Sequence, residues 1–270
     1  MTAATLEPTR GRSARRMLSL ARAETKLLVR NRTAVVNSLL LPIILVVFFW
    51  YAMPGEAMGG SMMHLLTMML VFTLLFVTYY NLVTTYVARR QDSVLKRMQT
   101  GELTDAEILL GTAVPTMLVS LVQIGIVTLG LGLLGELVMP TNLILIALAL
   151  VGGTALMIGL AAASTVFTRT AETAQITTLP LIMVSMGLSG LFFPLSILPD
   201  ALATISRFLP VTPVVELSNL GLFGQTAEQD VVVGFADTFS HAALPTAVLI
   251  AWILIGVYLT RDRFRWSPRA

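Results

Sequence analysis

Six long stretches without Asp, Glu, Lys or Arg dominate the sequence. They cover residues 33–55, 57–88, 108–135, 137–168, 173–199 and 238–260. A helix needs roughly 20 apolar residues to cross the hydrocarbon core of a bilayer, so each stretch is long enough. We therefore predict six transmembrane helices, with cores at 34–53, 63–87, 109–134, 142–167, 176–195 and 242–260.

The composition of the 270-residue chain agrees with a membrane protein. Hydrophobic residues make up 56% of it and charged residues 12%, whereas a soluble domain is about a quarter charged. This excludes an ordinary soluble globule, a disordered chain and a coiled coil. The absence of cysteine excludes a disulfide framework, a cysteine metal site and a thiol nucleophile. We expect an all-α integral membrane protein.

The basic residues indicate how the spans are oriented. Every Lys and Arg except Arg207 falls on the side of the membrane that holds the two termini. Because cytoplasmic segments carry the excess of Lys and Arg, we predict a multi-pass protein of the cell membrane with both termini in the cytoplasm. The domain plan is then a cytoplasmic leader at 1–32, a six-helix transmembrane domain at 33–262 and a short basic tail at 263–270.

Residues 13–31 of the leader have the pattern of a basic amphipathic helix. Apolar side chains gather on one face, and Arg22, Lys26 and Arg30 lie opposite. Such a helix is expected to lie along the cytoplasmic headgroups. Glu24 falls within the apolar face, so we expect it to pair with a basic side chain from a nearby loop.

The segment after the second span is basic and compatible with a helix. A small apolar patch within it, flanked by cations, suits docking into a groove of a partner protein. The alternative is an ordinary basic cytoplasmic loop. Gly101 can end this helix, and Thr104 with Glu107 forms a capping-box pattern that starts the third span. The segment contains Arg89, Arg90, Gln91, Asp92, Val94, Leu95, Lys96, Arg97 and Met98.

The external stretch 196–241 is long and not very polar. Pro199 and Asp200 predict a short helix at 201–209 that Pro210 ends, and Pro213 is expected to interrupt the chain again. Apolar but broken segments of this kind suggest short helices that dip back into the outer leaflet.

The span interiors contain no Asp, Glu, Lys or Arg, which argues against a proton relay. Neither Lys26 nor Lys96 lies in a phosphate-binding loop, so active transport would require ATP hydrolysis by another subunit. Two further patterns are interpreted as packing. They are the small-residue seam Ala155, Gly159 and Ala163, and the methionines Met62, Met63, Met68 and Met69, which we do not expect to bind metal.

Two motifs resemble the membrane subunits of ABC-2 type ABC transporters. One is the charged segment that ends in Glu107-Ile108-Leu109-Leu110-Gly111. The other is Ser189-Gly190-Leu191-Phe192-Phe193-Pro194, followed by Leu198-Pro199. The order of leader helix, six spans and basic tail is also similar, so the resemblance covers nearly the whole chain.

The resemblance implies a permease subunit of an exporter, with a drug-like or lipid cargo. Arg89–Thr100 would be the coupling helix on an ABC ATPase subunit, with 13–31 as the connecting helix beside it. A second permease copy or a related permease would complete the pathway. This chain would bind no cofactor itself, since ATP and Mg belong to the ATPase, and nucleic acid is not an expected partner. Residues 196–223 would form external re-entrant helices. The implied external gate contains Phe192, Phe193, Pro194, Pro199, Pro210 and Glu216.

The chain departs from the family pattern at the gate, because Asn219 stands near the place where an Arg is often found. Three other functions are compatible with a chain of six spans. An ion-gradient-driven secondary transporter or channel is the main alternative. An intramembrane serine protease would need Ser189 and His241 as a catalytic pair, but the expected motifs around them are missing. A passive scaffold would use the small-residue seam for contacts between proteins.

Overall fold

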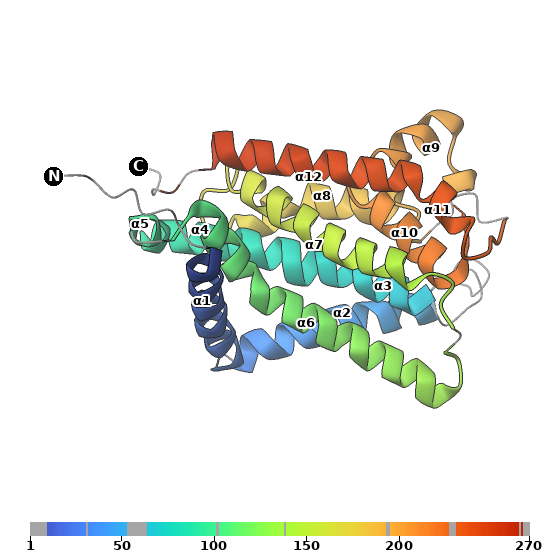
Figure 1. Cartoon of the computed structure of the whole chain (residues 1–270), viewed down its shortest axis with the longest axis horizontal. Coiled ribbons are helices and arrows are strands. Elements are labelled where there is room, and N and C mark those ends of the chain that lie inside the picture. The colour runs from blue at the N-terminus through green and yellow to red at the C-terminus, as the bar shows by residue number, and fades with distance from the viewer. Residues whose placement is uncertain are drawn as a thin grey trace.

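The chain folds into a bundle of helices (Figure 1). The structure is a computed structural model and describes residues 10–30, 32–52, 64–100, 103–137, 139–192, 195–226, 231–264 and 266. In these ranges, the β-structure is a single isolated bridge between Gln225 and Val232. The helices are α1 (Arg10–Arg30), α2 (Arg32–Ala52), α3 (His64–Phe72), η2 (Thr73–Tyr80), α4 (Asn81–Gln91), α5 (Val94–Gln99), α6 (Asp105–Leu134), α7 (Leu143–Ser164), α8 (Ala174–Leu188), η3 (Leu195–Ile197), α9 (Asp200–Arg207), α10 (Thr212–Phe223), α11 (Thr238–His241) and α12 (Ala243–Arg263).

Apolar helices occupy all six positions predicted for spans. Four are long and apolar enough to cross a membrane among the described residues: His64–Gln91, Asp105–Leu134, Leu143–Ser164 and Ala243–Asp262. Shorter apolar helices, Ser38–Phe48 and Ala174–Leu188, stand where the first and fifth spans are predicted. The structure therefore supports a multi-helix membrane protein with four candidate spans.

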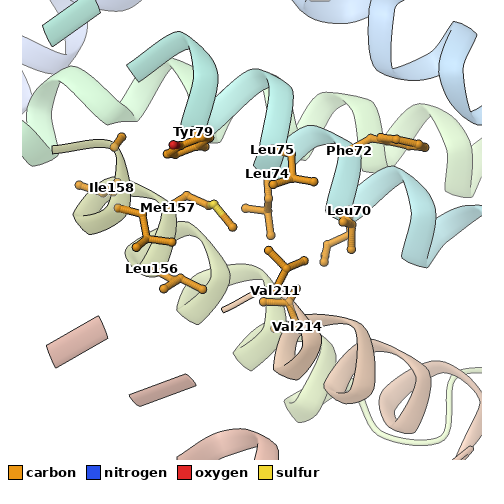
Figure 2. Close-up of a cluster of buried hydrophobic side chains, with 14 of the residues drawn as sticks. Leu70, Phe72, Leu74, Leu75, Tyr79, Leu156, Met157, Ile158, Val211 and Val214 are labelled. Atoms are coloured by element: carbon orange, nitrogen blue, oxygen red, sulfur yellow. The ribbon is translucent and has the colours of Figure 1, made fainter. Parts of the chain in front are cut away.

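The second predicted span lies at the centre of the bundle. It comprises α3, η2 and α4 in one continuous rod, and 83% of its most apolar window is buried, against 17% for α6. Side chains from η2, from α7 and from the start of α10 converge here, and Leu74, Met157 and Val214 are almost fully buried (Figure 2). Met68 and Met69 are also fully buried, which confirms that they are packing residues. Met62 and Met63 lie outside the described residues.

The small-residue seam on α7 allows a close crossing with α12. A Cβ atom placed on Gly159 would lie 3.1 Å from the Cα atom of Gly256. The two backbones therefore approach at a distance that side chains would prevent. The interpretation of the seam as packing within the chain is confirmed for Gly159.

Gln123 of α6 joins three helices inside the bundle. Pro42 of α2 has no backbone N–H to donate to the carbonyl of Ser38 four residues earlier. The Nε2 atom of Gln123 instead donates to the carbonyl oxygens of Ser38 and Leu39, at 2.8 and 3.0 Å. Its Oε1 atom accepts a hydrogen bond of 3.0 Å from the Thr73 hydroxyl. Gln123 is fully buried. Its side chain therefore supplies the hydrogen bonds that α2 lacks at Pro42 and links α2 to η2.

Thr73 is the first residue of η2, an eight-residue π-helix. π-Helical turns are rare and often occur at functional sites. The wider turn lies between α6, α7 and α8. The central rod is therefore irregular where it packs against these three helices, and Gln123 bonds to the first residue of the irregular segment.

The helices in the stretch predicted to be external follow the predicted breaks with one exception. α9 begins at Asp200 after Pro199 and ends at Arg207, close to the predicted 201–209. Pro213 does not interrupt the chain as expected. It lies in the first turn of α10, where the missing N–H of proline would have no partner within the helix in any case.

Replacing Gln123 with Leu should destabilise the protein by about 1–2 kcal/mol, because the two α2 carbonyls and the Thr73 hydroxyl lose their partner. Thermal unfolding in lipid nanodiscs measures the effect. Thr128→Val on the same helix is the matched control, because the Thr128 hydroxyl bonds only to the carbonyl of Ile124 in its own helix. Equal stability of the Gln123 and Thr128 variants would contradict the assigned role.

Candidate coupling and gating sites

The end of the bundle that carries α5 also holds α1 and the last turn of α12 (Figure 1). Here α1 runs across the bundle and packs against α6. A Cβ atom on Gly111 would lie only 2.7 Å from Leu20 of α1. Glycine at the end of the Glu107–Gly111 motif therefore makes room for the apolar face of α1. The capping box that precedes it is confirmed, with hydrogen bonds in both directions between Thr104 and Glu107.

Arg89 links three helices at this end. Its guanidinium group forms an ion pair with Glu24 of α1 and donates a hydrogen bond of 2.9 Å to the Thr112 hydroxyl of α6. Both charged side chains are largely buried, since 17% of the Arg89 surface and 11% of the Glu24 surface is exposed. The expectation that Glu24 pairs with a basic side chain is confirmed. That partner comes from the last turn of α4 rather than from a loop.

Arg90 is directed into the bundle, with only 1% of its surface exposed. It donates hydrogen bonds of 2.9 and 2.6 Å to the carbonyl oxygens of Thr165 and Thr168. These carbonyls lie just beyond the end of α7, where a positive charge is favourable for the helix dipole. The neighbouring Gln91 accepts a hydrogen bond from the backbone of Ala171. Arg90 and Gln91 thus join α4 to the segment between α7 and α8.

The predicted coupling helix is shorter than Arg89–Thr100, and this part of the prediction is wrong. α4 continues to Gln91, the chain turns at Asp92 and Ser93, and α5 spans Val94–Gln99. Ser93 is in the left-handed region with φ of 58°, so the two helices cannot be continuous. Gly101, predicted to end the helix, lies outside the described residues.

Only part of α5 faces outward. Leu95 is fully buried and anchors the helix, whereas Lys96 and Arg97 are exposed and Val94 and Met98 are half-buried. Asp92 is exposed, and its carbonyl accepts a hydrogen bond of 3.3 Å from Arg97. On α1, Arg22, Lys26 and Arg30 are all exposed, as the amphipathic pattern predicts. Exposed side chains of α5 and α1 therefore both contribute to the accessible basic surface at this end.

The opposite end of the bundle contains the residues predicted for the external gate. Phe192 is buried and its ring lies 6.1 Å from that of Phe72, centroid to centroid. Phe193 and Pro194 lie outside the described residues. Pro199 precedes α9, and Pro210 is buried between α9 and α10. The described gate residues therefore lie along the segment that runs from the end of α8 into α10.

Glu216 of α10 lies in a largely enclosed environment at this end, outside the four candidate spans. Its Oε1 atom is buried without a hydrogen-bond partner, as is the hydroxyl of Ser189, and both residues line a small cavity of about 10 Å³. Glu216 also borders a larger cavity of about 400 Å³ with Arg207 and His241. Burial raises the pKa of Glu216 to about 7, although the positive charge of Arg207 acts in the opposite direction.

Sequence reasoning missed several residues that the structure brings together. Arg207 was noted only as the single external cation, although it faces the same cavity as Glu216. Gln123 has no role assigned from the sequence, although Pro42 within an apolar run indicates that the Ser38 carbonyl needs another partner. No group of three or more His, Asp or Glu side chains suited to a metal was found in the described part of the chain.

The Glu24–Arg89 pair should hold α1 against the bundle. Glu24→Gln and Arg89→Gln should each increase amide hydrogen exchange in α1, and the double variant should show a coupling of about 1 kcal/mol rather than additive effects. Lys26→Gln, at an exposed position of the same helix, is the control. Fully additive effects would show that the pair does not act as a unit.

Glu216 should make stability depend on pH. Its pKa in the folded protein is about 7 against an ordinary 4.5, so the folded state holds its proton more tightly than the unfolded state does. Its favourable contribution is complete below pH 4.5 and is lost as the pH rises through about 7. Melting curves over this range should show stability falling with pH, and Glu216→Gln should flatten the trend. An unchanged slope in the variant would refute this assignment.

Comparison with known protein families identifies the family of this chain. No curated protein matches it. The sequence profile described as "ABC-2 family transporter protein" matches residues 53–260, which is most of the chain and includes three candidate spans and nearly all of the fourth. Together with the helical membrane architecture, this match shows that the chain belongs to the ABC-2 transporter family.

Proposed function

We propose that this chain is the membrane permease subunit of an ABC exporter that moves an amphipathic or lipophilic substrate, drug-like or lipid, out of the cell. A separate nucleotide-binding subunit would bind ATP and Mg and hydrolyse the ATP. A second copy of this chain, or a related permease, would complete the pathway. Family membership supports the permease role. The observation that carries the coupling assignment is the short basic helix α5, which is anchored by buried Leu95 and presents Lys96 and Arg97.

The proposed orientation has α1 and α5 in the cytoplasm and α9 and α11 outside. The exposed cations of α1 and α5, together with Arg261 near the end of α12, share one end of the bundle. Arg207 lies with α9 at the other end. The positive-inside rule then favours the cytoplasm for the basic end.

The proposed mechanism transmits movement of the ATPase through two arginines. A displacement of α5 by the ATPase would be transmitted to Arg89 and Arg90 through the turn at Asp92 and Ser93. Arg89 would pass it to α1 and α6, and Arg90 to the segment after α7, through the contacts described above. Rigid elements joined by shielded polar contacts can transmit a displacement when the assembly has two discrete arrangements. The predicted external gate at α8–α10 would be the receiving end.

Charge reversal on α5 tests the coupling assignment. Arg97→Glu should weaken binding to the ABC ATPase encoded beside this gene by about tenfold or more, because a like charge then faces the acidic docking surface that we expect on the ATPase. Affinity in nanodiscs and ATPase activity of the reconstituted complex measure it. Arg261→Glu, an exposed position at the same end of the bundle, is the matched control.

Two outcomes would overturn the proposal. Equal weakening by both variants would mean that net charge rather than α5 governs binding. If no neighbouring ATPase exists or none binds in lipid, the permease would have to work without ATP. Transport driven by an ion gradient, the alternative considered from the sequence, would then be the function to assay.

A further inference from the structure

A cavity of about 450 Å³ opens beneath α1, on the side of the bundle where α2, η2, α4 and α6 meet. It extends from the Glu24–Arg89 pair to Ser38, the residue whose carbonyl bonds to Gln123. Its volume is within the range of small-molecule sites, roughly 300–1,000 Å³. Neither the coupling surface nor the external gate uses it.

The cavity is amphipathic in its lining. Its apolar wall includes Leu27 and Leu28 of α1 and Val119 of α6. Its polar wall is made of hydroxyl and amide groups, contributed by Ser38, Tyr80, Asn81, Thr84, Thr85, Thr112 and Thr116. A pocket with a mainly apolar surface and several convergent polar groups is typical of sites that orient a small ligand.

Several of these polar groups have hydrogen-bonding capacity to spare. The hydroxyls of Thr84 and Thr116 donate to carbonyls of their own helices, which leaves their oxygens free to accept. The side-chain hydroxyls of Tyr80 and Thr85 make no hydrogen bond within the described part of the chain. Tyr80 lies nine residues before Arg89, about 14 Å along the helix. At such a depth in a span, polar groups gain from any ligand that can bond to them.

The charge in the cavity is already balanced. Glu24 and Arg89 are the ionisable groups with charge in the described lining, and they pair with each other. A charged ligand would find no free counter-charge here and would lose hydration without compensation. A neutral ligand with hydroxyl or amide groups would meet matching donors and acceptors. The lining therefore favours a neutral polar head on an apolar body.

We propose that this cavity is a binding site for an uncharged amphiphile that carries several hydroxyl or amide groups and enters from the inner leaflet. The polar head would lie against Tyr80, Thr85 and Thr116, with its apolar part along α1 and α6. Because the cavity contacts the Glu24–Arg89 pair, an occupant would also stabilise the position of α1. This site deepens the proposed function, and it rests on that proposal for its orientation in the membrane.

The test uses the full chain in nanodiscs and three photoreactive probes with the same alkyl chain. One has a glucoside head, one a sulfate head and one a trimethylammonium head. Saturable labelling within 77–85 and 112–119, located by mass spectrometry, is expected for the glucoside alone. Thr116→Phe should fill the cavity and reduce this labelling about tenfold. Leu118→Phe, which alters an exposed position of the same helix, should leave it unchanged.

A second variant guards against misfolding of the Phe variant. Thr85→Val keeps the shape of the side chain but removes its unpartnered hydroxyl, and it should weaken glucoside labelling severalfold without loss of thermal stability. Equal labelling by all three probes, or labelling that none of the cavity variants changes, would overturn the proposal. ATPase binding is measured on the same samples. A complex that assembles while the glucoside fails to label would refute this site alone, and labelling without any ATPase partner would refute the exporter assignment alone.

Discussion

Two adjacent guanidinium groups at the end of α4 determine how the helices meet at the basic end of the bundle. Arg89 reaches sideways to α1 and α6, and Arg90 reaches inward to the carbonyls that follow α7. Both groups are shielded from solvent, so each must be paired to be tolerated. These contacts hold four parts of the chain together at the last turn of α4. The parts are α4 itself, α1, α6 and the segment that follows α7. α5 follows directly, and its orientation depends on that turn.

The same principle recurs along the central rod, where buried polar groups are matched across helices. Gln123 satisfies the carbonyls that Pro42 leaves free, and Asn219 of α10 accepts a hydrogen bond from Thr67 of α3. Asn142 donates to Thr238 at the end of the bundle that carries α11. Five buried side-chain oxygens in the described residues have no hydrogen-bond partner. Glu216 is the carboxylate among them, and the others are the hydroxyls of Thr78, Ser189, Ser206 and Thr212. Of these groups, Ser189 follows α8, Ser206 lies on α9, and Thr212 and Glu216 lie on α10, so most of the unmatched oxygens are at the predicted gate.

Much of the fold could be predicted from the sequence because the governing signals are local. Runs without charge gave the positions of the apolar helices, and Thr104 with Glu107 gave the start of α6. The need of Glu24 for a partner was predictable, since a carboxylate on an apolar face is costly. The identity of that partner was not, because Arg89 is 65 residues away and nothing local indicates which way its side chain turns.

The candidate sites were harder to predict for the same reason. Arg89 and Arg90 have the composition of an exposed basic loop, and only the tertiary fold shows that both are turned into the protein. The sequence places Leu95 in an apolar patch but does not show that its side chain is buried against the bundle. The cavity under α1 is formed by residues from four distant segments, so no single motif indicates it. The expected break at Pro213 is wrong because proline is also tolerated in the first turn of a helix, and the local pattern does not distinguish the two positions.

The central claim is that α5 is the contact with a nucleotide-binding subunit, and proximity cross-linking tests it most directly. The chain has no cysteine, so Arg97→Cys introduces a unique attachment point for a short thiol-reactive photo-cross-linker in the complex with the ATPase. Ile205→Cys, at an exposed position of α9 at the other end of the bundle, is the comparison. The account predicts efficient cross-linking to the ATPase from position 97 and none from position 205. Cross-linking from position 205 alone, or from neither position in an active complex, would contradict it.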